Sequence, residues 1–563
     1  MFEFQVKPIL TIQDITELKK LTKINSKVQK LTNIGLINSQ EYHKLGFVLK
    51  RINTLIQADA SFTLFTHNRF QALLLGLKQL PIKKLTITFQ SCHSLDDSIL
   101  KSLSQTLKRL SFLTSLTLSF TDFSFIRKDP GISKGISILF SKLKTLKFLS
   151  SLKIKSYSPN VFNNCYYLKE LSSSLENFHS LQILILDFYD FSNINDKGLS
   201  SFSKALKKLT NLKKLRFSIN NCNASDEGIQ SFSMVLRKLS SLSSLALSLE
   251  KSKDVKEGGR LESLFLALRD LNSLSALNLN FGSGSTINDE IEDMEALSLG
   301  FEYLLSLRVL KLSFQRRPLI TNDTIKCLAI GVRCLASLNS LELLFSDCST
   351  IQEIGSFAHS FEKLVELSEL KIHVRRCRNI ENQEIELFFS SFRHLKSLLD
   401  LELKFSNCPF ITNSGLKSLF HTFGNFPRLV KLSLDFYFNS NVSDITLETL
   451  DLNLERLSSL LSIYLNFGSC CQITDNGVIS LASCLQNLES LTSLALDFSQ
   501  NEQIGEKGIE SLISKIADLK SLTQTTLSFV QCQDISKEKL SSICVRLKDS
   551  TIIWYNHNQL FQK

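Results

Sequence analysis

The chain has 563 residues, of which 43% are hydrophobic and 21% are charged, a balance that excludes an intrinsically disordered chain. Its 65 Lys and Arg residues outnumber its 54 Asp and Glu residues, but the net charge of +11 is spread along the chain and is too weak a bias to indicate nucleic acid binding. No apolar run is long enough to cross a bilayer, and the opening MFEFQVKP lacks the apolar core of a signal peptide. We therefore expect an intracellular, cytoplasmic protein with no membrane span, with the nucleus and the axoneme as open alternatives.

The first sixty residues do not share the repeat found further along the chain. Asn38 and Glu41 have the spacing of a capping box, and the apolar residues between positions 45 and 56 fall on one helical face. A repeat array exposes the apolar flank of its first unit, so an amphipathic segment is needed to cover that flank. We assign residues 1–60 to a helical N-terminal cap, residues 61–547 to the array, and residues 548–563 to a C-terminal edge strand (Thr551–Tyr555) and tail.

From residue 82 onward, a short segment of the form L-x-x-L-x-L-x-F recurs, and we count about fifteen repeats spaced 29 to 36 residues apart. Its alternate residues are apolar, as in a strand with one buried face. The clearest copy is LELKFSNC at residues 401–408, and the Phe residues of this copy and its four successors are equally spaced: Phe405, Phe436, Phe467, Phe498 and Phe529. A single globule gives no reason for equal spacing, so the sequence predicts a solenoid in which equivalent side chains stack.

Each predicted strand is followed by a loop of shared form and by a helix. Loops such as Ile411–Gly415 and Ile473–Gly477 offer an Ile to the core, a Thr that can cap a helix, and a polar or acidic residue in the first helical turn. Apolar residues then recur at every third or fourth position, as in Leu199, Phe202 and Leu206. One strand and one helix are therefore expected in each repeat.

Cysteine occupies a fixed position in many repeats. Seven of the thirteen cysteines lie three residues after the last apolar residue of a strand: Cys92, Cys222, Cys348, Cys377, Cys408, Cys470 and Cys532. We interpret this position as a buried structural one, because a small and weakly polar side chain fits where the backbone turns off the strand. A metal site would need paired ligands such as C-x-x-C, which the chain lacks, so we predict neither a metal nor another cofactor.

The pattern L-x-x-L-x-L-x-F-x-x-C, followed by I-T-D-x-G and a helix, resembles the leucine-rich repeats of ribonuclease-inhibitor-like proteins, including the cysteine-containing subtype of F-box substrate receptors. The resemblance covers residues 82–547 and implies an α/β leucine-rich repeat solenoid, a curved right-handed superhelix with parallel strands on the concave face and helices on the convex face. The abundance of Phe, Lys, Asn and Ile with only seven Pro is similar to the expanded repeat families of ciliated protozoa. The resemblance is less specific for function, because this scaffold serves inhibitors, ubiquitin-ligase receptors, GTPase activators and signalling scaffolds.

Catalytic motifs are missing from the sequence. We find no H-E-x-x-H, no G-x-S-x-G and no phosphate-binding loop with its Lys, and the nine His residues have no recurring partner. The glycine-rich segment Gly282–Thr286 lies where a strand turns into a loop, a place where small residues are expected. The sequence therefore predicts a non-enzymatic protein with no small-molecule substrate.

The strand alternation predicts which side chains point out of the concave face toward a protein partner. In the N-terminal part these side chains are basic, with two tyrosines just past the strands, whereas the C-terminal part is mixed but rich in carboxylates, with Lys371, Lys404 and Lys431 between them. Such charge segregation suits a partner with its own polarised surface, and exposed Tyr is favoured at binding hot spots. The predicted contact residues are Lys153, Lys155, Tyr157, Tyr189, Lys214, Arg216, Glu342, Glu369, Asp400, Glu402, Tyr437 and Tyr464.

The leading hypothesis is a scaffold that holds a protein partner of unknown identity against the concave face. One alternative is the substrate-recognition subunit of a cullin-type ubiquitin ligase, although residues 1–60 contain no convincing F-box. A second is a GTPase-activating protein of the Ran-activator type, although the segment 556–563 lacks the acidic tail usual in those proteins. Arginines on two post-strand turns, Arg316-Arg317 and Arg375 with Arg376 and Arg378, are either solvated charges or a basic ridge for phosphate or an acidic protein.

Overall fold

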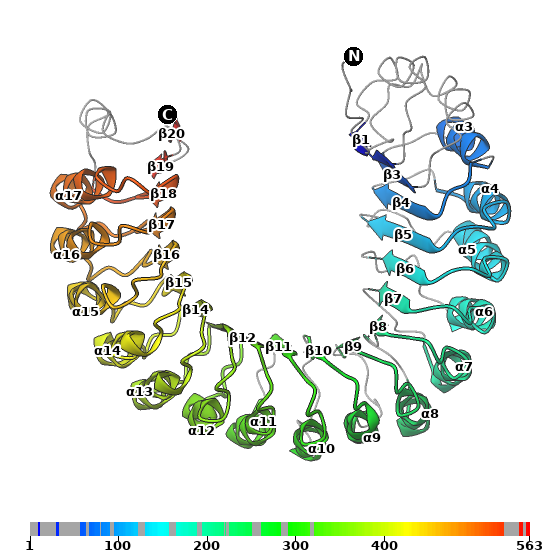
Figure 1. Ribbon diagram of the computed structural model, residues 1–563, viewed down its shortest axis with the longest axis horizontal. Helices are drawn as coiled ribbons and strands as arrows, with labels where there is room; N and C mark the ends of the chain where they lie inside the picture. Colours follow the sequence, from blue (N-terminus) through cyan, green and yellow to red (C-terminus); the bar gives the residue numbers. More distant parts are fainter. Residues whose placement is uncertain are drawn as a thin grey trace, which may run out of the picture. The chain divides into compact units, whose positions relative to one another are not determined.

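The computed structural model shows strands alternating with helices along the chain (Figure 1). It divides into two compact units, Met1–Leu274 (unit 1) and Ser275–Lys563 (unit 2). The residues described are 9–11, 30–32, 57–63, 67–78, 80–90, 95–121, 130–156, 165–188, 194–218, 220, 224–249, 261–282, 291–315, 320–533, 551–555 and 559–562.

In unit 1 the described strands pair in parallel, each with the next along the chain. The strands are β1 (Ile9–Thr11), β2 (Lys30–Thr32), β3 (Gln57–Thr63), β4 (Lys84–Gln90), β5 (Ser115–Thr121), β6 (Ser151–Ser156), β7 (Ile183–Phe188), β8 (Lys214–Ser218) and β9 (Ser244–Ser248). The helices are α3 (His67–Leu77), α4 (Asp97–Leu107), α5 (Pro130–Leu143), α6 (Cys165–Leu175), α7 (Asp196–Leu206), α8 (Asp226–Leu236), α9 (Glu262–Leu266) and the 3-10 helix η2 (Ala267–Asp270).

Unit 2 repeats the arrangement, with a parallel ladder from β10 to β19 and one antiparallel pairing, β19 with β20. Its strands are β10 (Ala276–Asn280), β11 (Val309–Gln315), β12 (Ser340–Ser346), β13 (Glu369–Arg375), β14 (Asp400–Ser406), β15 (Lys431–Asp435), β16 (Ser462–Asn466), β17 (Ser493–Asp497), β18 (Gln524–Ser528), β19 (Thr551–Tyr555) and β20 (Gln559–Gln562). Its helices are α10 (Ile291–Phe301), α11 (Asn322–Arg333), η3 (Ile354–Phe357), α12 (Ala358–Phe361), α13 (Asn382–Ser390), η4 (Ser391–His394), α14 (Asn413–Phe420), η5 (Phe423–Asn425), α15 (Asp444–Leu454), α16 (Asp475–Leu485) and α17 (Glu506–Ala517).

The fifteen predicted repeat strands are β4 to β18. The first two inward residues of every one are at most 4% exposed, from Leu85 and Ile87 on β4 to Thr525 and Leu527 on β18. Equivalent residues face each other across neighbouring strands, because the register advances by a whole repeat at each pairing. Burying one face of every strand is the main stabilising contribution, at about 25 cal/mol per Å² of apolar surface.

The equally spaced phenylalanines stack as predicted. The ring centroids of Phe405 and Phe436 are 6.5 Å apart, and the following pairs along the array are 5.8, 6.2 and 6.0 Å apart. All five rings are fully buried. These separations are within the range of favourable aromatic pairs, so the rings form one continuous column in unit 2.

The predicted cysteine position is buried wherever the structure describes it. Cys348, Cys377, Cys408, Cys470 and Cys532 are at most 8% exposed and are free thiols. Their sulfur atoms donate to a main-chain carbonyl one repeat earlier, as Cys470 Sγ does to Phe436 O at 3.3 Å. Cys92 and Cys222 lie outside the described residues.

At the N-terminus, β3 continues the ladder of β4 in full register, residue for residue. The helix predicted between residues 45 and 56 lies outside the described residues, so the boundary between cap and array stays a prediction. At the other end, Thr551–Tyr555 is strand β19, which lies between β18 and β20.

Candidate protein interface on the strand face

The outward side chains of the strands form a surface in each unit, which we call the strand face. On β6, Lys153 and Lys155 are partly exposed while the residues between and beside them are buried. On β8, Lys214 and Arg216 are exposed on either side of the buried Leu215. The structure therefore places all four predicted basic residues of unit 1 on the strand face.

These four residues surround one apolar side chain. In the register of β6, β7 and β8, Ile185 lies between Lys153 and Arg216. Ile185 is only 9% exposed although it occupies an outward position. Long cationic side chains cover neighbouring apolar surface with their aliphatic stems and leave their charges in water. The cluster thus combines cationic tips with an apolar base.

One carboxylate belongs to this basic cluster. Arg216 Nε lies 3.2 Å from Asp187 Oδ2, and the hydroxyl of Ser218 donates to the other oxygen of Asp187 at 3.3 Å. In the described part of unit 1, no ion pair involves Lys153, Lys155 or Lys214. The cluster of four cations and one carboxylate therefore keeps a net positive charge. Tyr157 and Tyr189, the two predicted aromatic contacts of unit 1, lie outside the described residues.

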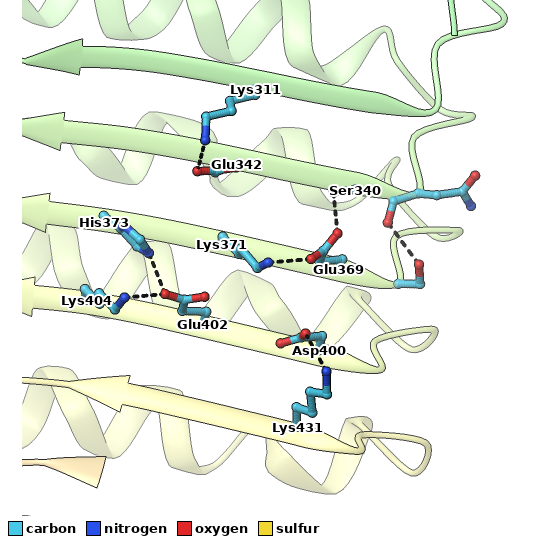
Figure 2. Close-up of polar contacts among 12 residues, drawn as sticks. Lys311, Ser340, Glu342, Glu369, Lys371, His373, Asp400, Glu402, Lys404 and Lys431 are labelled. Carbon is cyan, nitrogen blue, oxygen red and sulfur yellow. Dashed lines mark hydrogen bonds and ion pairs between the residues drawn. The ribbon is translucent and has the colours of Figure 1, made fainter. Parts of the chain in front are cut away.

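The predicted acidic residues of unit 2 lie on β12, β13 and β14, where each is paired with a neighbour (Figure 2). Lys311 Nζ is 2.5 Å from Glu342 Oε1 on the next strand. Glu369 accepts from Lys371 at 2.6 Å and from the hydroxyl of Ser340 at 2.7 Å. Hydrogen bonding to Lys371 lowers the pKa of Glu369, and the same contact raises the pKa of Lys371.

Glu402 is the most strongly held of these carboxylates. Its Oε1 lies 2.9 Å from His373 Nε2 and 2.5 Å from Lys404 Nζ, so residues of two neighbouring strands converge on one oxygen (Figure 2). The hydrogen bond from His373, assisted by Lys404, lowers the pKa of Glu402 to about 2. Asp400 behaves differently, because partial burial raises its pKa and its cation, Lys431, is 4.0 Å away.

Because of these pairings, the negative charges at the acidic end of the predicted surface are balanced by lysines of the same surface. On β11 to β15, the cations Lys311, Lys371, Lys404 and Lys431 sit among the four predicted carboxylates. A carboxylate that already accepts from a lysine offers little unscreened charge to a partner. The net charge available for recognition is therefore larger on the strand face of unit 1 than on that of unit 2.

The two predicted tyrosines of unit 2 are differently placed. Tyr464 lies on the strand face of β16, half-buried, and burial raises the pKa of its hydroxyl. Tyr437 lies just beyond β15, is 37% exposed, and donates from its hydroxyl to Gln500 Oε1 at 3.1 Å, two repeats away. Tyr437 is therefore an exposed but fixed aromatic side chain.

Sequence reasoning missed three elements of this surface. Asp187, Lys311 and His373 were not among the predicted contacts, yet each is paired with a residue that was. The signal that identifies them is strand register: Lys311 lies directly opposite Glu342, whereas Asp187 and His373 lie one outward position along from the residues opposite Arg216 and Glu402.

Neither a metal centre nor a membrane-spanning helix is evident in the part of the chain that the structure describes. There, no three His, Cys, Asp or Glu side chains are grouped so that they could hold a metal ion. Likewise, none of the described helices has the length and apolar character needed to cross a bilayer.

Comparison with known proteins gives similarity at the level of structure only. No family model and no curated protein matches the chain. An internalin from Listeria monocytogenes is 18% identical, with a TM-score of 0.38, over 78% of this chain and 94% of its own. A Leptospira interrogans leucine-rich repeat protein is 15% identical, with a TM-score of 0.39, over 87% and 100% of the two chains. A structure of the yeast Rad7 and Elc1 complex matches at 18% identity and a TM-score of 0.35, over 72% of this chain and 90% of the matched chain.

The fold assignment rests on the ladder itself. Parallel strands with the leucine pattern alternate with helices, and equivalent residues stack from repeat to repeat. These features define an α/β leucine-rich repeat solenoid.

Proposed function

We propose that this protein is a non-enzymatic scaffold that binds a protein partner on the strand face, centred on the basic cluster of unit 1. The observation that supports this is the contrast between the units. Lys153, Lys155 and Lys214 carry unpaired charge around Ile185, whereas the four predicted carboxylates of β12 to β14 in unit 2 each lie within 4.0 Å of a lysine. A cationic rim over an apolar centre fits an acidic protein surface with an apolar contact at its middle.

The repeat type supports the same proposal. One strand and one helix in each repeat, with Cys or a similar polar residue buried after the strand, fit the ribonuclease-inhibitor-like, cysteine-containing subtype. Scaffolds of this type present their strand side to partners, so the same face is proposed here.

The test is a fourfold charge reversal, Lys153→Glu, Lys155→Glu, Lys214→Glu and Arg216→Glu. The tagged wild-type protein is used to purify its partner from the native source, and we expect the partner to be lost from the reversed variant. The matched control reverses four exposed lysines on the helices, Lys101, Lys169, Lys197 and Lys204, and should keep the partner. Equal recovery with both variants, each folded by circular dichroism, would show that the strand face of unit 1 is not the interface.

The same purification separates the two alternatives. A cullin and its adaptor in the purified complex would assign the chain to a ubiquitin ligase as the substrate-recognition subunit. Accelerated GTP hydrolysis by a co-purified small GTPase would assign it to the Ran-activator type. A stoichiometric partner without either activity is the result that the scaffold proposal expects.

A further inference from the structure

The turns that follow the strands of unit 2 are so regular that each repeat serves as a control for the others. In each of the turns after β12 to β18 one residue has a positive φ, between 55° and 64°. In six of these seven turns its backbone N–H continues the ladder by donating to the next repeat, as Phe438 N does to Gly468 O at 2.8 Å. The residues in this position are Asp347, Arg376, Asn407, Phe438, Ser469, Gln500 and Gln531. The left-handed conformation is thus imposed by the array and not by the residue type.

Phe438 is the exception in this series, because the other six residues are polar. A bulky aromatic residue is poorly suited to the left-handed region, where Asn and Asp are enriched. Its ring is also 53% exposed, so burial does not offset the cost. The fold alone gives no reason for Phe at this position.

A second exception lies one repeat earlier. Three residues after the positive-φ position, a side-chain amide usually donates to a carbonyl of the preceding repeat: Asn379 to Ser349 O at 2.7 Å, Asn441 to Pro409 O at 2.6 Å, Gln472 to Ser440 O at 2.7 Å and Gln503 to Cys471 O at 2.8 Å. Phe410 takes this position in its own repeat and is 50% exposed. It therefore replaces a structural hydrogen bond with exposed apolar surface.

The surroundings of these two rings form a defined rim. The ring of Tyr437 lies 6.1 Å from that of Phe438 and is fixed through its hydroxyl by Gln500. The repeat before Phe410 carries Arg375, Arg376 and Arg378, all exposed. Among residues 320–533 only Arg376 of these three has an ion pair, with Asp347 at 3.4 Å. Three consecutive repeats thus carry the three arginines, then Phe410, then Tyr437 with Phe438.

We propose that this rim, made of Arg375, Arg376, Arg378, Phe410, Tyr437 and Phe438, binds a short extended peptide of a partner protein that carries acidic and apolar side chains. Neighbouring strands are about 4.8 Å apart, so the arginines and Phe438 are separated by about 10 Å across two repeats. An extended peptide rises about 3.3 Å per residue. The peptide therefore carries an Asp or Glu about three residues from a Leu, Phe or similar side chain, with the carboxylate on the arginines.

This rim lies on turns of unit 2 and is separate from the basic cluster of unit 1. Peptide binding at the rim should persist in the fourfold charge reversal of the strand face. Failure of one proposal therefore leaves the other testable.

The experiment uses a display library of random twelve-residue peptides selected on the full chain. We expect enriched peptides to share an acidic residue about three positions from an apolar one, and to bind Phe410→Asn and Phe438→Asn about tenfold more weakly, as is typical of hot-spot aromatics. Arg375→Glu with Arg378→Glu should weaken them further and reduce the salt dependence. The matched control is Phe112→Asn, which alters a 66% exposed ring in unit 1 and should leave binding unchanged.

A second measurement separates a binding role from a structural one. Phe438→Asn places a residue tolerant of positive φ in the turn, and Phe410→Asn restores a side-chain donor toward the carbonyl of Arg378. Both variants should raise the thermal midpoint, by about one to three degrees, while weakening the peptides. A lower midpoint in both variants would show that the aromatics are structural and would overturn the proposal.

Two further outcomes also contradict it. One is that the enriched peptides lack acidic residues, or that they bind the Phe410→Asn, Phe438→Asn double variant as tightly as wild type. The other is tight, Phe410-dependent binding of single-stranded oligonucleotides by a chain that selects no peptide, which would assign the rim to nucleic acid.

Discussion

At the scale of single residues, Glu402 shows how the strand face of unit 2 is held. Its pKa is lowered from 4.5 to about 2, so the ionised carboxylate stabilises the folded state. The contribution is complete above pH 4.5 and is lost as the pH falls from about 4.5 toward 2. Glu402→Gln should therefore lower the free energy of unfolding by about 2 kcal/mol at pH 7 and by much less near pH 2.5.

Urea unfolding of wild type and Glu402→Gln across this pH range checks the prediction. Glu448→Gln, an exposed change on α15, is the control and should follow the wild-type curve. A wild-type advantage that stayed constant down to pH 2.5 would mean that the ionisation of Glu402 does not carry it.

The sequence predicted individual side-chain contacts less completely than it predicted strands and helices. Seven cysteines marked the buried position after the strand, but Asn439 and Asn501 fill this position in their own repeats. They donate to the equivalent carbonyls, as Asn439 Nδ2 does to Phe405 O at 2.6 Å. The ion pairs were equally invisible, because Lys311 and Glu342 are 31 residues apart and only the register of β11 and β12 brings them together. Composition at outward positions identified the surface, but not which of its charges are free.

At the scale of elements, the loop motif before each helix has a second role beside the expected one, since its acidic residue lies in the first helical turn and also contacts the next repeat. The acidic residue was interpreted as complementing its own helix, yet Asp444 at the start of α15 accepts from the backbone and the hydroxyl of Thr474, at 2.8 and 2.6 Å, in the next repeat. The glycine of that next repeat is then forced, because a Cβ on Gly477 would lie 2.4 Å from Asp444 Oδ1. Strands and helices followed from apolar periodicity, whereas the recurring Asp and Gly of the loop motif do not by themselves show that they contact each other across neighbouring repeats.

A double-mutant cycle tests the contact. Gly477→Ala should destabilise unit 2 by about 1 to 3 kcal/mol through overpacking against Asp444. Asp444→Ala removes two hydrogen bonds but also the obstacle, so the double variant should be more stable than the sum of the single changes predicts, by about 1 kcal/mol. Chemical denaturation of the four proteins measures this coupling, and strict additivity would show that the glycine has another cause. Gly424→Ala, whose added Cβ would meet only Arg456 at 3.5 Å, is the control.

At the scale of the whole molecule, the array predicts that a local defect stays local. In each unit the helices and strands contact their immediate neighbours in the array, so stability is a sum of repeats and nearest-neighbour interfaces. Asn439→Ala is a suitable defect, because it removes two side-chain donors and the acceptor for Cys408 N, all buried, at a cost of about 3 kcal/mol.

Hydrogen exchange measured by mass spectrometry shows how far this defect spreads. Exchange should accelerate in β14, β15 and β16, which contact the altered turn, while peptides from β4 to β8 in unit 1 keep wild-type protection. A chain that unfolds in one cooperative step would instead lose protection everywhere by the same free energy. Uniform loss would therefore reject nearest-neighbour stability for this solenoid. Local loss would mean that the basic cluster of unit 1 and the aromatic rim of unit 2 can be altered independently.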